Sequence, residues 1–220
     1  MNKTALIYGS SGLVGSKLLA QLLANDHYGK VKVFVRKPLP VDHSKLEQVI
    51  IDFDDADNIR DKAKGDEVYI CLGTTMAKAG SKEAFYKVDH DFVVRAATSA
   101  AANGLPKLCL ISSMGADVHA WVYYSKVKGE VEQEISRLPF EAIHIVRPSL
   151  LLGDRKEQRS GEKLGILISK AVTFIFIGPL AKYKPIEDET VARSMISYME
   201  SQSTGVHIHF SDDLQKFANP

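Results

Sequence analysis

The sequence has little cysteine, no excess of charge of one sign and no long uninterrupted apolar run. Its two cysteines, Cys71 and Cys109, each lie inside an apolar run and form no CxxC pair, which disfavours a disulfide framework and a zinc site. His207 and His209 alternate along one stretch with no third ligand nearby, so an ordinary strand is the better interpretation. The 28 Lys and Arg residues balance 27 Asp and Glu residues, and a net charge of +1 gives no large field for binding phosphate backbones. We therefore expect neither a metal site nor a nucleic-acid partner.

The most apolar stretch, residues 164–180, is too interrupted to span a membrane. Gly165, Lys170, Gly178 and Pro179 break it, whereas a spanning helix needs about 20 apolar residues in succession. Three roles stay open for this stretch: it covers a cleft, completes the core, or contacts a second copy of the chain in a homodimer.

The first residues carry no secretory pattern. Met1–Thr4 leads directly into the strand-like Ala5–Tyr8, without a charged start, an apolar stretch and a small-residue cleavage site. We therefore expect a cytoplasmic location.

Short apolar runs alternate with helical patterns as far as about Arg147, which is typical of successive βαβ units. The predicted strands are Thr4–Tyr8, Val31–Val35, Val49–Ile51, Val68–Leu72, Lys107–Ser112 and Ala142–Val146. The helices predicted between them are Leu13–Ala24, Asn58–Lys64, Lys82–Asn103 and Trp121–Arg137. This order predicts an α/β fold with a Rossmann-like, doubly wound parallel sheet.

The rhythm weakens after Pro148, where a helix near Glu189–Met199 and a short strand Val206–Phe210 are expected. At 220 residues, with 45% hydrophobic and 25% charged residues, the chain is expected to form one domain. Residues 148–220 are expected to contribute a small cap on the substrate side of that domain.

A glycine-rich turn follows the first strand and opens the first helix. Its residues are Gly9, Ser10, Ser11, Gly12, Leu13, Val14 and Gly15. The first glycine permits a tight turn, the second lets the backbone approach a pyrophosphate, and the third lets helix and strand pack closely. The free N–H groups at the start of the helix can then bind the phosphates of a dinucleotide.

Residues at the ends of the next strands suggest which dinucleotide is bound. Arg36 and Lys37 follow the second strand, where an NAD-specific fold usually has a carboxylate, and a guanidinium there can grip a 2′-phosphate. NADP(H) is therefore preferred, with solvated surface cations as the alternative for this pair. Near the cofactor we also expect Asp52 and Phe53 at the adenine, and Leu72, Gly73 and Thr74 after the fourth strand. The alternative role of Asp52 is that of a turn or cap residue.

The fifth strand ends at Ser112-Ser113, and the next helix carries Tyr124 and Lys128 four residues apart on one face. Because ligands bind at the carboxyl ends of parallel strands, the trio of Ser113, Tyr124 and Lys128 can converge beside a nicotinamide. The Lys128 ammonium would stabilise the phenolate of Tyr124 and make it a usable general acid or base, while Ser113 would donate to the reacting oxygen. Ser112 and Tyr123 are the alternative serine and tyrosine.

These motifs together resemble the atypical short-chain dehydrogenases/reductases, and among them the Tat-interacting-protein-like oxidoreductases. The likeness covers residues 3–163. The stretches that carry it are Gly9 to Gly15, Val35-Arg36-Lys37, Cys71 to Thr75, Lys78-Ala79-Gly80, Val88-Asp89, Ser112 to Asp117, Tyr124 to Glu132, Arg147-Pro148, Leu151 to Arg155 and Gly161-Glu162.

The resemblance implies NADPH in the glycine turn and at Arg36, Tyr124 as the proton-exchanging group, and Arg147 near the nicotinamide or the substrate. One position departs from most of the superfamily: Asp89 stands where an asparagine usually joins a proton relay. The usual relay is therefore in doubt.

We accordingly expect an NADPH-dependent oxidoreductase that reduces a carbonyl or an activated alkene of a small-molecule substrate. The alternative from another class is an NADP(H)-sensing module that binds a regulatory protein partner without turnover. A nucleoside-diphosphate-sugar epimerase uses the same trio, but a cap of about 70 residues is small for a nucleotide sugar.

Overall fold

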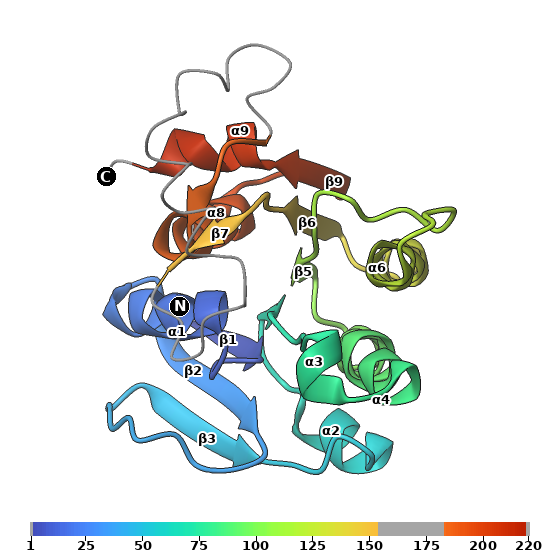
Figure 1. Cartoon of the computed structure of the whole chain (residues 1–220). Coiled ribbons are helices and arrows are strands. Elements are labelled where there is room, and N and C mark those ends of the chain that lie inside the picture. Colours follow the sequence, from blue (N-terminus) through green and yellow to red (C-terminus); the bar gives the residue numbers. More distant parts are fainter. Residues whose placement is uncertain (1, 154–182, 219–220) are drawn as a thin grey trace.

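The computed structural model describes residues 2–153 and 183–218 and has a seven-stranded parallel sheet (Figure 1). Its strands follow the order β3-β2-β1-β4-β5-β6-β9, and every neighbouring pair is parallel. Their bounds are β1 Lys3–Tyr8, β2 Tyr28–Val35, β3 Leu46–Ile50, β4 Glu67–Ile70, β5 Lys107–Ile111, β6 Ala142–Arg147 and β9 Gly205–Phe210. Two short strands, β7 Leu151–Leu152 and β8 Ile186–Glu187, form a separate parallel pair. The Rossmann-like α/β fold predicted from the sequence is confirmed.

Helices cover both faces of the sheet, as successive right-handed crossovers require. Their bounds are α1 Leu13–Ala24, α2 Ala56–Lys62, α3 Met76–Ala79, α4 Lys82–Tyr86, the π-helical turn η1 Lys87–Asp91, α5 Phe92–Ala102, α6 Tyr123–Ile135, α8 Asp188–Glu200, α9 Ser211–Leu214 and the 3₁₀ turn η4 Gln215–Phe217. Side chains of α1 and α8 pack on one face, and those of α2, α5 and α6 pack on the other. Figure 1 shows α1 and α8 on one side and α2 and α6 on the other.

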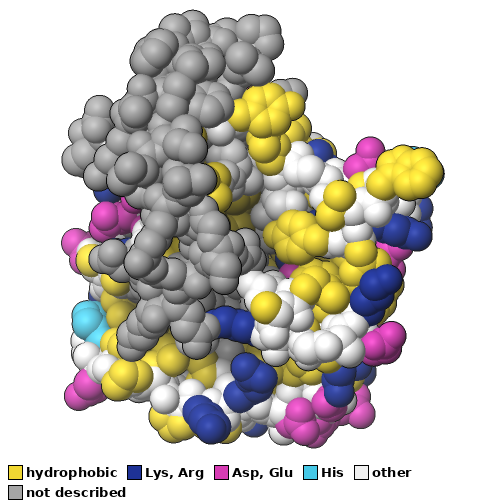
Figure 2. All heavy atoms as spheres, in the orientation of Figure 1, with side chains coloured by type: hydrophobic (Ala, Val, Ile, Leu, Met, Phe, Trp, Pro, Cys, Tyr) yellow, Lys and Arg dark blue, Asp and Glu magenta, His cyan; other side chains and the backbone are white. Residues whose placement is uncertain are grey.

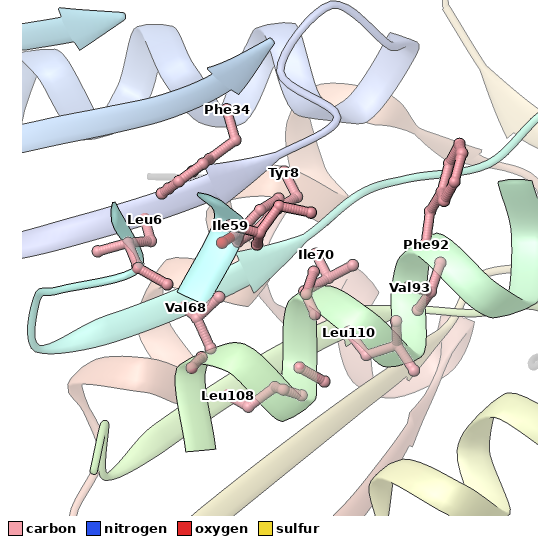
Figure 3. Close-up of a cluster of buried hydrophobic side chains, with 14 of the residues drawn as sticks. Leu6, Tyr8, Phe34, Ile59, Val68, Ile70, Phe92, Val93, Leu108 and Leu110 are labelled. Carbon is pink, nitrogen blue, oxygen red and sulfur yellow. The ribbon is translucent and has the colours of Figure 1, made fainter. Parts of the chain in front are cut away.

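The central strands are apolar almost throughout because both of their faces are buried. Along β1, Leu6 and Tyr8 point into the core beneath α2 and α5, whereas Ala5 and Ile7 belong to the core beneath α1 and α8. Figure 3 shows Leu6, Tyr8 and Phe34 gathered with side chains from β4, β5, α2 and α5. The Tyr8 and Phe34 rings stack with their centroids 4.3 Å apart.

The strand order reverses between β1 and β4, and this switch point positions the candidate site. Chain connections leave β1 and β4 toward opposite sides, which opens a crevice at the carboxyl ends of these two strands. The glycine-rich turn follows β1 and residues 71–75 follow β4, so two of the predicted cofactor segments lie side by side there.

The single helix expected over Lys82–Asn103 is instead α4, the π-helical turn η1 and α5 in succession. A π turn carries one more residue than an α turn, and such insertions are frequent at functional sites. Here it buries two polar side chains, Asp89 and His90. Helix α3 was missed in the sequence because it is four residues long; Thr75 caps it by accepting a hydrogen bond from the Lys78 N–H.

Two elements expected in the substrate cap instead belong to the main sheet and to the helices that cover it. Strand β9 pairs in parallel with β6, and α8 packs against α1. The rest of the predicted cap, residues 154–182 with the apolar stretch 164–180, lies outside the described residues. In the part of the chain that is described, no helix has the length and apolarity of a membrane span.

Candidate functional site

The glycine-rich turn is pressed against the chain that follows β4. Gly9 has a φ of +87°, and a Cβ on it would lie 2.5 Å from the carbonyl carbon of Cys71. A Cβ on Gly15 would lie 2.1 Å from the Gly9 carbonyl oxygen. A side chain on Gly9 would clash with the backbone of Cys71 and Leu72, and one on Gly15 would push helix α1 away from the turn, so close packing requires both glycines.

The turn leaves donor groups available at the start of α1. Gly12 is the N-cap of α1, and no side chain caps the helix. Ser11 and Gly12 are exposed, whereas Leu13 is half-buried and Val14 is buried. The Ser10 hydroxyl is buried and has no hydrogen-bond partner among the described residues. The Gly12 N–H donates to the Gly9 carbonyl at 3.0 Å, which leaves the N–H groups of the first helical turn, with the Ser10 hydroxyl beside them, to bind the phosphates of a dinucleotide.

The residues after β2 and β3 lie in contrasting surroundings. Arg36 and Lys37 are exposed directly after β2. Asp52 is also exposed, and its carboxylate accepts a hydrogen bond of 2.9 Å from the Asp54 N–H, which is the turn role weighed as its alternative. The Phe53 side chain, 5% exposed, is part of the core and lies with its ring centroid 5.2 Å from that of Phe92. Its side chain is therefore not presented to a ligand.

Helix α6 brings Tyr124 and Lys128 to the crevice. The Lys128 Nζ lies 6.0 Å from the centroid of the Tyr124 ring and 3.7 Å from the place where a Cβ on Gly73 would be. The Tyr124 ring also lies 5.9 Å from that of Phe85 on α4. Since Gly73 follows β4 and has no side chain, the ammonium reaches the end of that strand.

The Lys128 ammonium forms a buried ion pair that sequence reasoning did not find. Its Nζ lies 2.9 Å from Asp89 Oδ1, and the other carboxylate oxygen accepts a 2.7 Å hydrogen bond from the Thr74 N–H. The sequence shows that an aspartate replaces the asparagine that most of the superfamily has at position 89. Only the structure, through the π-helical turn η1, shows that this aspartate contacts Lys128. The backbone of Thr74 is thereby engaged by the protein itself.

The alternative serine and tyrosine have other partners. Ser112 donates its hydroxyl to Glu132, whereas the Ser113 hydroxyl is buried with no hydrogen-bond partner among the described residues. Tyr123 donates to the carbonyl of Lys82 at 3.3 Å. Of these two serines and two tyrosines, Ser113 and Tyr124 are thus the ones whose hydroxyl groups form no hydrogen bond to another described residue.

The guanidinium of Arg147, which the resemblance placed near the nicotinamide or the substrate, is held by Glu132 of α6. Arg147 Nε lies 3.0 and 3.1 Å from the two carboxylate oxygens of Glu132. Both residues line a pocket of about 370 Å³ between α6 and the loop at residues 116–118. The structure therefore gives Arg147 a contact that anchors α6 to the sheet.

Hydrophobic side chains gather on the face shown in Figure 2, over the region of α4 and α6. Trp121 and Val122, which precede α6, are fully and 63% exposed. Met76 of α3 and Leu150, which follows β6, are 40% and 43% exposed. Among the described residues, no group of three or more His, Cys, Asp or Glu side chains could hold a metal ion.

Comparison with known proteins shows the family to which the chain belongs. The chain matches the model of a family described as NAD(P)H-binding over residues 9–165. Protein HTATIP2 of Rattus norvegicus is 34% identical over 212 residues, which cover 93% of this chain and 84% of that protein. Mitochondrial protein FMP52 of Candida albicans is 31% identical over 227 residues, which cover 98% of each.

Solved structures share the fold at low sequence identity. A short-chain dehydrogenase/reductase superfamily protein of Agrobacterium tumefaciens with bound NAD has a TM-score of 0.71 and 15% identity, covering 94% of this chain and 77% of that one. UDP-N-acetylglucosamine 4-epimerase of Methanobrevibacter ruminantium has a TM-score of 0.70 and 16% identity, covering 95% and 76%. A shared fold at such identities does not determine the reaction.

The expectation of a cytoplasmic location is wrong. FMP52 relatives from several fungi, among them Candida glabrata and Eremothecium gossypii, are named as mitochondrial proteins. The missing secretory pattern bears only on secretion and leaves other destinations open. The matches support the resemblance found in the sequence: the chain belongs to the NAD(P)H-binding family, has HTATIP2 and FMP52 among its relatives, and shares its Rossmann-like fold with dehydrogenases and epimerases.

Proposed function

We propose that the protein is an NADPH-dependent oxidoreductase that reduces a carbonyl or an activated alkene of a small molecule. The observation that carries this proposal is the placement of Tyr124 and Lys128 on one face of α6, with the ammonium beside Gly73 at the end of β4. That position adjoins the glycine-rich turn, and family membership supports a dinucleotide there.

The cofactor is proposed to bind across the carboxyl ends of β1 to β4. Its pyrophosphate would lie on the N–H groups at the start of α1, with the Ser10 hydroxyl beside them. Arg36 and Lys37 would hold the 2′-phosphate, and Asp52 would lie near the adenine. Leu72 and Gly73 would flank the cofactor, and Lys128 would lie near the nicotinamide ribose. When bound, the reduced cofactor supplies a hydride.

The residues of the chain would handle the oxygen and the proton of the reduction. The Ser113 hydroxyl, which has no other partner in the described part of the chain, would donate a hydrogen bond to the carbonyl oxygen. As the carbonyl carbon gains the hydride, Tyr124 would donate its phenolic proton to that oxygen, which completes the alcohol. The Lys128 ammonium would stabilise the phenolate left on Tyr124 until water reprotonates it.

The first test follows NADPH oxidation by absorbance across a panel of aldehydes, ketones, quinones and UDP-sugars. Tyr124→Phe should reduce turnover by about a hundredfold or more, since it removes the general acid, and leave NADPH affinity within about twofold. Tyr123→Phe is the matched control and should retain activity, because that hydroxyl is bound to the Lys82 carbonyl. A Tyr124→Phe enzyme with normal turnover would contradict the proposed role.

A second candidate is the NADP(H)-sensing module, and the exposed Trp121 and Val122 beside α6 favour it. If no acceptor in the panel consumes NADPH, and a protein partner binds only the NADPH-loaded chain, this candidate replaces the oxidoreductase. Conversion of a UDP-sugar without net cofactor oxidation would instead indicate an epimerase.

A further inference from the structure

The Lys128–Asp89 pair is an unusually buried arrangement for two charges. The side chains of Lys128 and Asp89 are 7% and 1% exposed, and the charged atoms lie 2.9 Å apart. Buried charges are costly unless paired, so each of these residues constrains the other. The Thr74 N–H, bound to the second oxygen of Asp89, fixes the carboxylate from the other side.

The backbone that carries Asp89 is itself held in place. His90, the next residue of η1, lies with Nδ1 3.0 Å from Asp91 Oδ1 and Nε2 3.1 Å from Glu134 Oε1. Its ring stacks on that of Tyr86, with centroids 4.3 Å apart. The π-helical turn is therefore tied to α6 by His90 on one side and by Asp89 on the other.

The carboxylate of Asp89 also changes what the lysine does to its neighbour. An ammonium alone near a phenol favours the phenolate, but a carboxylate 2.9 Å from that ammonium offsets much of its field. A reductase needs the neutral phenol rather than the phenolate, since its general acid must hold a proton when the substrate binds.

We propose that Asp89 is a positioning residue that fixes the Lys128 ammonium beside Gly73 and offsets its charge, so that Tyr124 keeps its proton for delivery to the substrate. The inference rests on the proposed function, and it deepens it by assigning the residue that keeps Tyr124 in the protonated form with which the reduction begins. It also gives a physical role to the aspartate that replaces the usual asparagine.

Other charged groups of α4 and α6 lie around the neighbouring Tyr123. Lys82 Nζ lies 5.3 Å from the centre of the Tyr123 ring. Burial raises the pKa of Tyr123, and the carboxylates of Glu83 and Glu130 raise it further. In the described part of the chain, the cation over the Tyr124 ring is Lys128, and the carboxylate paired with that cation is Asp89.

The test is an NMR titration of the full-length protein labelled with carbon-13 at tyrosine Cζ. The Tyr124 resonance is assigned by its loss in Tyr124→Phe, and its ionisation is then followed with pH. Asp89→Asn, which keeps the shape but removes the charge, should shift the ionisation of Tyr124 to lower pH by about one pH unit or more. Lys128→Met should shift it to higher pH.

Asp91→Asn is the matched control, since it removes a carboxylate from the same turn that pairs with His90 instead. It should leave the Tyr124 ionisation where it is. An unchanged midpoint in Asp89→Asn, or an equal shift in Asp91→Asn, would overturn the inference. The titration needs no substrate, so the two proposals can fail separately. If the Tyr124 ionisation shifts in Asp89→Asn but the native protein turns over no acceptor, only the reductase is rejected. If the native protein turns over an acceptor but the ionisation does not shift, only the role of Asp89 is rejected.

Discussion

Arg36 is the residue on which the choice between NADPH and NADH depends in the proposed site. It is exposed at the end of β2, where a guanidinium can make two charge-assisted hydrogen bonds to a 2′-phosphate. Arg36→Ala should therefore weaken NADPH binding by about tenfold to a hundredfold and leave NADH binding nearly unchanged. Fluorescence titration with each cofactor measures both affinities.

Arg60→Ala is the matched control for this change. Arg60 is also an exposed arginine, but it pairs at 3.0 Å with Asp57 on its own helix α2. Removing its side chain should change the affinity for neither NADPH nor NADH. Equal affinity of the native protein for NADPH and NADH, unaltered in Arg36→Ala, would remove the phosphate contact from the proposed site.

Sequence spacing predicted residues whose role follows from backbone geometry better than residues whose role follows from their side-chain partners. Gly9 and Gly15 follow from a strand-turn-helix pattern, and their close contacts are present. The neighbours of Asp89, Arg147 and Phe53 could not be derived in this way. Their partners come from segments distant in sequence, and tertiary packing alone decides which polar group meets which charge.

At the scale of elements, helix α6 carries the proposed acid and must be held in register with the ends of β5 and β6. Glu132 anchors it, because its carboxylate binds Arg147 of β6 and accepts from Ser112 at the end of β5. Glu132→Gln would leave the largely buried guanidinium without its counter-charge. We expect the free energy of unfolding to fall by about 2–3 kcal/mol.

Chemical denaturation measures this loss, with Glu134→Gln as the control. Glu134 lies on the same helix but is 47% exposed and pairs with His90. Removing its charge should cost less than about 1 kcal/mol. Equal losses in the two variants would show that the Glu132 contact does not anchor α6.

The elements with strong periodicity were predicted well. Helix α1 has the bounds expected from the sequence, Leu13–Ala24, because apolar residues recur along one face of it. The expected helix Lys82–Asn103 was wrong in its regularity, since the π turn depends on burying Asp89 and His90 against α6. Helical periodicity gives no signal for such a turn.

At the scale of the whole molecule, the sequence did not show that the chain adds a seventh strand, β9, to the sheet after the six strands predicted as far as Val146. Strand β9 comes after Pro148, where the alternation of strand and helix patterns weakens, so its pattern fitted a cap as well as a sheet edge. Its neighbour β6 supplies His144, which lies across from His207 and His209 of β9. The seventh strand is thus joined to the sheet partly through three imidazole rings.

We expect the contact between His144 and His209 to make the docking of β9 sensitive to acid. Their nitrogens lie 3.0 Å apart, and the His209 ring stacks on Tyr198 of α8 at 3.6 Å. Burial, with the neighbouring imidazoles of His209 and His207 and the ammonium of Lys107, lowers the pKa of His144 to about 4. Burial likewise lowers the pKa of His209 to about 4, although the Asp213 carboxylate opposes the shift.

Because the unfolded chain takes up protons on these histidines below about pH 6.5 and the folded chain does so only near pH 4, stability should fall as the pH decreases through that window. After allowance for solvent screening, we expect the pair to account for about 1–2 kcal/mol. Urea unfolding from pH 7 to pH 4 measures the free energy, and His209→Gln should flatten its decline. His119→Gln, at an exposed histidine, should keep the native slope. If both variants follow the native curve, acid does not act on the molecule through the β6–β9 contact.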